Sequence, residues 1–196
     1  DTGRPNHSDL NANIIKSHNV TLSDTDDDNN GHSTNVCGII AAIDNDEGII
    51  GVAPHAKLIP IKVLDESGVG GFDAIEQGIL LAIEDCVDII TMSLGTQAEP
   101  PQSLHDAIKK ATDKGIVVLA ASGNEGSKKP DFPALYPEVI AIGSTNSHND
   151  ISEFTNTGEK LEFDAPGENI YSCYLHNGYC SMSGTSQATP FIAGIV

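Results

Sequence analysis

The stretch DAIEQGILLAIEDCVDIITM, residues 73–92, contains the two patterns that decide the fold. In residues 73–84 apolar side chains recur every three or four positions, which predicts a helix with one apolar face. Residues 87–92 form a short apolar run of the kind that makes a buried strand. A helix followed at once by a buried strand indicates an α/β fold built on a parallel sheet.

The same alternation continues on both sides of this stretch. Apolar runs predict further strands at residues 58–64, 116–120 and 139–142. A second helix is expected after a candidate cap at Ser103 and before a stop at Gly115, with its apolar face formed by Leu104, Ala107, Ile108 and Ala111. We therefore expect one domain over residues 1–196, a doubly wound, mostly parallel sheet with helices on both faces. Ligands of such sheets bind beyond the carboxyl ends of the strands.

The charge of the chain excludes several classes of partner. It has 28 acidic and 10 basic residues and a formal net charge of -18, which argues against a nucleic-acid surface or an anionic membrane. No apolar run approaches the length of a membrane span, and no signal-peptide pattern begins the chain. We expect no nucleic-acid partner and no membrane span.

The four cysteines are too few for a disulfide scaffold in a chain of this length. Cys37 and Cys86 lie in apolar periodic segments, which predicts small buried hydrophobic side chains. Cys173 and Cys180 flank an Asn-Gly turn signal, so their thiols could face each other across a hairpin, and a disulfide there stays open. The Asp/Asn-rich residues 24–30 predict a solvated loop without a function.

Four short segments carry side chains that could act on one substrate. Ser186 lies in SGTSQATP (183–190), at the start of an apolar helical pattern, and His32 lies at the start of another, GHSTNVCGIIAA (31–42). DTG (1–3) supplies the carboxylate of Asp1, and ASGNEG (121–126) ends a buried strand with the carboxamide of Asn124. Alone, each residue has an ordinary explanation, such as a helix cap for Ser186.

Together, these residues supply the groups that nucleophilic catalysis by a serine requires. A serine hydroxyl needs an imidazole to accept its proton, and the imidazole needs a carboxylate to hold its tautomer. Ser186, His32 and Asp1 would fill these roles. The negative oxygen that develops on an attacked carbonyl needs fixed donors, which the Asn124 side chain and the Ser186 backbone N–H would supply.

These segments, in the order Asp, His, Ser, resemble the motifs of the subtilisin-like serine proteases (subtilases), for which this order is known. Residues 88–95 and 165–170 are most similar to the acidic, intracellular-type subtilisins. The resemblance implies a serine endopeptidase that acts on peptide or protein substrates through an acyl-enzyme and is made with an inhibitory propeptide. It favours an intracellular location only weakly. Family domains extend further at both ends, so we expect a partial catalytic domain.

The resemblance also implies a substrate site. Two edge segments would pair with an extended substrate backbone, one containing Gly68 and Gly70 and the other Ser93, Leu94 and Gly95. The pocket for the residue before the scissile bond would be lined by Ala121, Ser122 and Gly123, with Glu125 and Asp131 near its floor or rim. Two carboxylates there would favour Lys or Arg, unless Lys128 and Lys129 neutralise them.

A structural calcium ion is implied in the same way. Its ligands would be the side chains of Asp9 and Asn45 and the carbonyls of Ile43, Glu47 and Ile49. Calcium takes about six to eight oxygens, and one family ligand lies upstream of Asp1. A merely solvated acidic loop is the alternative.

Three residues depart from the family pattern. Ser33 stands in place of a glycine, Asn35 in place of a second histidine, and Gln187 where many relatives carry methionine. Extra bulk at Ser33 could tilt His32, whereas Gln187 removes an oxidation target beside the nucleophile. These departures motivate a second hypothesis, a protease-like fold kept as a binding or regulatory module. A third hypothesis, a nucleotide-binding α/β domain, is disfavoured because the first strand is not followed by the glycine-rich motif that such domains carry.

Overall fold

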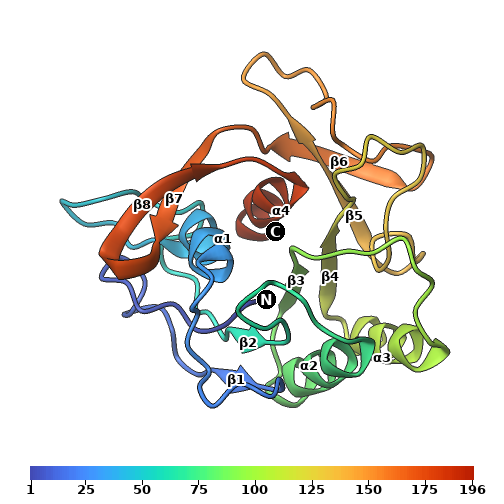
Figure 1. Cartoon of the computed structure of the whole chain (residues 1–196), viewed down its shortest axis with the longest axis horizontal. Coiled ribbons are helices and arrows are strands. Elements are labelled where there is room, and N and C mark those ends of the chain that lie inside the picture. The colour runs from blue at the N-terminus through green and yellow to red at the C-terminus, as the bar shows by residue number, and fades with distance from the viewer.

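A parallel four-stranded sheet forms the centre of the molecule (Figure 1), for which a computed structural model describes residues 1–196. The strands lie in the order β3-β4-β5-β6, and every neighbouring pair is parallel. Their bounds are Ile89–Met92 (β3), Val117–Ala121 (β4), Ile140–Thr145 (β5) and Leu161–Pro166 (β6). The prediction of a mostly parallel sheet is confirmed.

Helices cover both faces of this sheet, as expected. Their bounds are His32–Ala41 (α1), Phe72–Glu84 (α2), Gln102–Thr112 (α3) and Thr185–Ile195 (α4). Because side chains alternate along a strand, neighbouring residues of β4 enter different layers. Val118 and Ala120 pack with α2 and α3, whereas Leu119 packs with α1 and α4. No helix of the chain is both long and apolar enough to cross a membrane.

A short parallel pair, β1 (His18–Asn19) and β2 (Ile61–Lys62), lies beside the main sheet. The predicted strand at residues 58–64 was too long, because its last backbone groups have a different partner. The N–H groups of Val63 and Leu64 donate to the carbonyl of Asp1, at 2.9 and 3.1 Å. This contact holds Asp1 at the end of β2.

Of the two predicted ends of α3, only the C-terminal one is confirmed. Gly115 has a left-handed φ of 83° after the helix, as a stop residue requires. The predicted cap at Ser103 was wrong, because the helix already begins at Gln102, with Pro101 before it. The Ser103 hydroxyl instead donates to Glu76 of α2 at 2.6 Å.

An antiparallel hairpin, β7 (Ile170–Tyr174) and β8 (Gly178–Met182), precedes α4. Cys173 lies opposite Tyr179, and Cys180 lies opposite Ser172, so the two thiols point to opposite faces and are not bonded. The register therefore answers the question that spacing left open. Cys37 is buried as predicted, but Cys86 is exposed in the turn after α2.

Candidate active site

Asp1 and His32 are joined by a hydrogen bond that aligns the imidazole. His32 is the first residue of α1, and its Nδ1 donates to Asp1 Oδ1 at 2.9 Å. The backbone N–H of Thr2 donates to the same carboxylate oxygen at 2.7 Å. Since Nδ1 is engaged, Nε2 is the nitrogen left to accept a proton. The extra bulk of Ser33, which is buried, does not break this alignment.

Asp28 connects the segment of Asp1 to the start of α1. Its side chain is 6% exposed and accepts the Thr2 hydroxyl at 2.8 Å. It also accepts the backbone N–H groups of Asn30, Gly31 and Thr34 and the Thr34 hydroxyl, at 2.7 to 3.1 Å. The expectation of a functionless, solvated loop at residues 24–30 was therefore wrong for Asp28, whose carboxylate receives the N–H groups at the start of the helix.

Burial also sets the protonation state of the imidazole. Burial, followed by the positive charge of the Asp1 ammonium, lowers the pKa of His32 from its ordinary value near 6.5 to about 4, against an opposing effect of the Asp28 carboxylate. Desolvation disfavours the charged imidazolium. His32 is consequently neutral at neutral pH, which is the state that a general base requires.

Ser186 lies in the first turn of α4 and exchanges hydrogen bonds with Ser93, the residue after β3. The Ser186 hydroxyl donates to the Ser93 carbonyl at 3.2 Å, and the Ser93 hydroxyl donates to the Ser186 carbonyl at 2.8 Å. No hydrogen bond joins Ser186 to His32. Catalytic hydrogen bonds are often long without substrate, and a turn of the hydroxyl away from Ser93 frees it for other partners.

Asn124 follows β4 and has a fixed amide orientation. Its Oδ1 accepts the backbone N–H of Thr185 at 2.8 Å and the Thr185 hydroxyl at 3.0 Å. The Asn124 Nδ2 is left as a free donor next to the start of α4. The Ser186 N–H belongs to the first helical turn, where backbone donors have no intrahelical acceptor. Both groups are thus available to stabilise a developing oxyanion.

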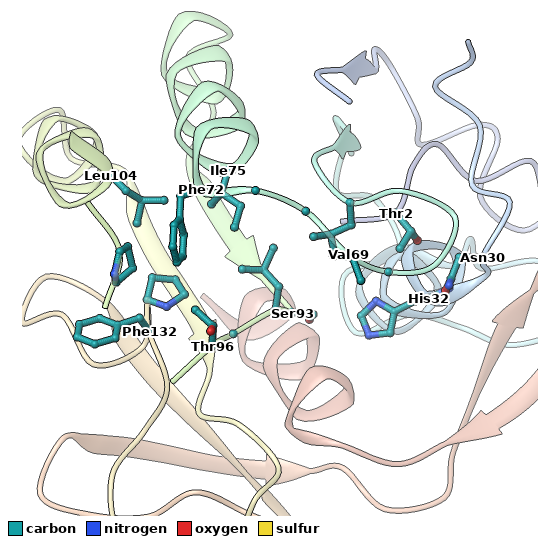
Figure 2. A pocket seen from close by; sticks show the side chains of 18 residues that line it. Thr2, Asn30, His32, Val69, Phe72, Ile75, Ser93, Thr96, Leu104 and Phe132 are labelled. Atoms are coloured by element: carbon teal, nitrogen blue, oxygen red, sulfur yellow. The ribbon is translucent and has the colours of Figure 1, made fainter. Parts of the chain in front are cut away.

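A cavity of about 500 Å3 is lined by His32 and by Ser93, the residue that holds Ser186. Figure 2 shows Thr2, Asn30 and His32 at one end and Phe72, Leu104 and Phe132 at the other. The two expected substrate segments meet along it, because its lining includes Gly68, Gly70, Ser93, Leu94 and Gly95. The far end of the cavity is apolar. This feature was not predicted, because its apolar residues come from three separate segments of the sequence.

The acidic residues of the expected specificity pocket come together through Asn156. The Asn156 Nδ2 donates to Glu125 Oε2 at 2.7 Å and to Asp131 Oδ1 at 3.2 Å. A Cβ added to Gly95 or Gly123 would lie 3.5 or 2.7 Å from Asp131 Oδ2. The carboxylate therefore lies between the segment after β3 and the end of β4, where Ala121, Ser122 and Gly123 are buried.

No cation of the chain neutralises these two carboxylates. The ion pairs of the molecule involve neither Glu125 nor Asp131. Lys129 instead places its ammonium 5.5 Å from the centre of the Phe132 ring. Burial, followed by the charge of Glu125, raises the pKa of Asp131 to about 6. Asp131 is thus charged at neutral pH at an energetic cost, which a cationic ligand would offset.

The expected calcium ligands also lie together. Asp9 is buried, and its carboxylate accepts the Tyr179 hydroxyl at 2.7 Å, Asn45 Nδ2 at 3.2 Å and the Ile49 N–H at 3.3 Å. A Cβ on Gly48 would lie 2.0 Å from Asp9 Oδ2, so the loop of Ile43, Glu47 and Ile49 wraps closely around the carboxylate. These residues offer the oxygen ligands that calcium takes. Asn45 turns its Nδ2 to Asp9, while its Oδ1 accepts the Glu47 N–H at 2.9 Å, so this carboxamide has to rotate before it can bind an ion.

His7 and Cys173 lie next to Asp9 but are poor additions to a metal site. Ligand atoms of the three residues lie within 4.8 Å of one another. However, His7 Nε2 donates to the Gly178 carbonyl at 3.0 Å, and His7 Nδ1 accepts the Asp9 N–H at 3.1 Å. Burial raises the pKa of Cys173 to about 12, so the thiol is not a thiolate.

The chain is similar in sequence to known proteins over its whole length. The sequence profile of the Subtilase family matches residues 1–196. The chain is 46% identical over 205 residues to the Intracellular serine protease of Paenibacillus polymyxa, covering 99% of this chain and 63% of the relative. It is 43% identical over 206 residues to the Major intracellular serine protease of Bacillus subtilis, covering 99% and 64%. It is 45% identical over 177 residues to the Minor extracellular protease Epr of Bacillus subtilis, covering 90% and 27%.

The chain thus spans less than two thirds of the length of these relatives. The family match nevertheless extends over every residue of the chain, and the relatives that it resembles are named as serine proteases. The chain belongs to the subtilase family.

Proposed function

We propose that this chain carries the catalytic centre of a serine endopeptidase. The observation that supports this most directly is the hydrogen bond of 2.9 Å between His32 Nδ1 and Asp1 Oδ1. It orients a neutral imidazole beside a cleft whose wall, at Ser93, also holds Ser186.

In the proposed reaction, Ser186 Oγ attacks the carbonyl carbon of the scissile peptide bond, and His32 Nε2 takes the hydroxyl proton. Asp1 stabilises the imidazolium, while Asn124 Nδ2 and the Ser186 N–H donate to the oxyanion. His32 then gives the proton to the leaving amine, which breaks the C–N bond and leaves an acyl-enzyme. A water molecule, deprotonated by the same imidazole, hydrolyses the ester and regenerates Ser186.

The substrate would bind as an extended chain along the cleft, between the segments of Gly70 and Leu94. The apolar end of the cleft, at Phe72, Ile75 and Leu104, would accept a substrate side chain that is apolar and lies several residues before the scissile bond. The residue just before that bond would enter the pocket of Asp131. We propose a preference for Lys or Arg there, supported by two carboxylates that lack a cationic partner.

We also propose a structural calcium ion at Asp9, Asn45 and the carbonyls of Ile43, Glu47 and Ile49. The buried carboxylate and the closely wrapped loop support it. Bound there, calcium would tie the start of the chain to the loop after α1 and so stabilise the fold, without a direct part in the reaction.

A fluorophosphonate probe tests the proposed activity. It reacts covalently with an activated serine, so we expect labelling of the chain, strengthened by calcium, and none of Ser186→Ala. Ser181→Ala, which alters an exposed serine of β8, is the matched control and should label normally. If the chain stays unlabelled with and without calcium, the alternative of a binding module on a protease fold is favoured.

A further inference from the structure

Two buried carboxamides join the helix of His32 to the helix of Ser186. Asn35 lies one turn after His32 in α1, and Gln187 directly follows Ser186 in α4. Their side chains meet, because Gln187 Nε2 donates to Asn35 Oδ1 at 3.2 Å. The residues are 0% and 1% exposed. Asn35 and Gln187, which are two separate departures from the family pattern in the sequence, therefore contact each other in the fold.

The Asn35 end of this carboxamide pair is fixed by further hydrogen bonds, and the Gln187 end lies beside Gly184. Asn35 Nδ2 donates to the Cys173 carbonyl at 3.4 Å, and the Asn35 carbonyl accepts the Ser172 hydroxyl at 2.8 Å, so α1 is tied to β7. Gln187 Oε1 lies 3.1 Å from the place where a Cβ on Gly184 would be, and the Asn124 amide atoms lie 3.6 Å from the same place. The pair thus reaches from the helix of His32 to the turn that precedes Ser186.

The burial of this contact restrains how α1 and α4 can shift along each other. Helices α1 and α4 pack side by side (Figure 1), and Asn35 and Gln187 meet between them. A buried amide that loses its partner keeps the full cost of desolvation, so sliding one helix along the other is disfavoured. Proton transfer from Ser186 to His32 depends on the same relative position, and a misplacement of about 1 Å lowers rates on the order of 100-fold.

We propose that Asn35 and Gln187 act as a pair of positioning residues that set the distance between His32 and Ser186. The inference rests on the proposed function, since it concerns the geometry of that triad. Neither side chain needs to touch the substrate. Their effect should therefore fall on the chemical step and leave substrate binding nearly unchanged.

A double-mutant cycle tests the pair, using Asn35→Leu, Gln187→Met and the double variant. We expect each single variant to lower kcat about 10-fold or more, with KM changed less than about twofold. In the double variant no amide is left without a partner, so its loss should be smaller than the product of the single losses by about fivefold or more. The rate of fluorophosphonate labelling should follow kcat.

Asn13→Leu is the matched control. Asn13 is also buried, and it donates to the carbonyls of Ala41, at the opposite end of α1 from His32, and of Pro54, without contacting Asn35 or Gln187 by a hydrogen bond. It should lower Tm without lowering kcat per labelled site. The proposal is wrong if the single losses of kcat simply multiply, or if Asn35→Leu and Gln187→Met resemble this control.

An exchange of the two side chains covers the case in which the apolar variants do not fold. Asn35→Gln and Gln187→Asn each change the reach of one amide, whereas together they restore the summed length. We expect kcat to recover in the combined exchange, and a combined loss equal to the product of the single losses would overturn the proposal. Absence of labelling in the unaltered chain would instead contradict the proposed function itself.

Discussion

Ser93 and Ser186 hold each other by two hydrogen bonds, each hydroxyl donating to the other residue's carbonyl. The reason lies one turn further along α4. Pro190 has no N–H, so the carbonyl of Ser186 lacks its normal helical donor. The Ser93 hydroxyl, at the end of β3, supplies the missing bond. A proline inside the helix thereby ties the candidate nucleophile to the sheet.

This relationship predicts the effect of Ser93→Ala. Loss of the donor leaves the Ser186 carbonyl unpaired, which should cost about 1 kcal/mol of unfolding free energy and lower kcat roughly 10-fold through displacement of Ser186. In a Pro190→Ala background, the N–H of residue 190 can donate instead, so Ser93→Ala should cost less. Urea unfolding and kcat measured in both backgrounds check this. Equal losses in the two backgrounds would contradict the role assigned to Pro190.

Asp131→Asn should reduce the preference for a basic residue before the scissile bond. Hydrogen bonds to charged groups contribute about 1.5 to 3 kcal/mol, so the ratio of kcat/KM for Arg over Phe substrates should fall roughly 10- to 100-fold. In the unaltered chain, the same ratio should fall as the pH drops through about 6, where Asp131 takes up a proton. Taking the ratio cancels the titration of His32. A pH-independent ratio, or a preference for Phe throughout, would sink the proposed specificity.

The same substitution should stabilise the fold at neutral pH. The pKa of Asp131 is raised in the folded chain, from 3.8 to about 6, so folding disfavours the charged carboxylate. Between these values the unfolded chain loses its proton first, and stability falls as the pH rises. We expect the Tm advantage of Asp131→Asn to grow from about pH 4 to pH 6 and then to level off. Thermal unfolding across this range is the measurement, and an advantage that shrinks with rising pH would contradict the raised pKa.

Asp9→Asn should abolish stabilisation by calcium. A ligand that binds only the folded chain stabilises it by about 2.7 kcal/mol at 100 times its Kd, so calcium should raise the Tm of the unaltered chain. Asp46→Asn is the matched control, because Asp46 is an exposed acidic residue of the same loop whose side chain is not an expected ligand. Thermal unfolding with calcium and with a chelator compares the three proteins. A calcium effect that survives Asp9→Asn would place the ion elsewhere.

The chain should resist peroxide better than its Gln187→Met variant. Methionine beside the nucleophile would be oxidised to a polar sulfoxide, whereas glutamine is inert. Cys180 is partly exposed and lies 3.9 Å from Asn35 Nδ2, so Cys180→Ser serves as the control for oxidation of a thiol. Residual activity after timed exposure is the measurement. Rapid loss in the unaltered chain that Cys180→Ser does not prevent would contradict the prediction.

The elements of the fold could be predicted because their patterns are local. The spacing of Ile75, Ile79 and Ile83 marks α2, and the apolar run before Met92 marks β3, since helices and strands repeat over a few residues. The residue types and order of Asp1, His32 and Ser186 were enough to propose a catalytic triad, and of its contacts the structure contains the hydrogen bond between Asp1 and His32. The boundaries were less accurate: Val63 and Leu64 leave β2 because their N–H groups bind Asp1, a residue distant in sequence.

The sequence by itself therefore determined the α/β class, the parallel sheet and the residue types available for hydrolysis. The tertiary structure alone decided that Asp28 is buried under α1, that Asn156 bridges Glu125 and Asp131, and that Asn35 meets Gln187. It also decided, through the register of β7 and β8, that Cys173 and Cys180 face apart. The physical reason is the separation along the sequence of the residues that determine each feature. Periodicity is set by the geometry of consecutive residues, whereas a hydrogen bond between residues 152 positions apart exists only once the chain has packed.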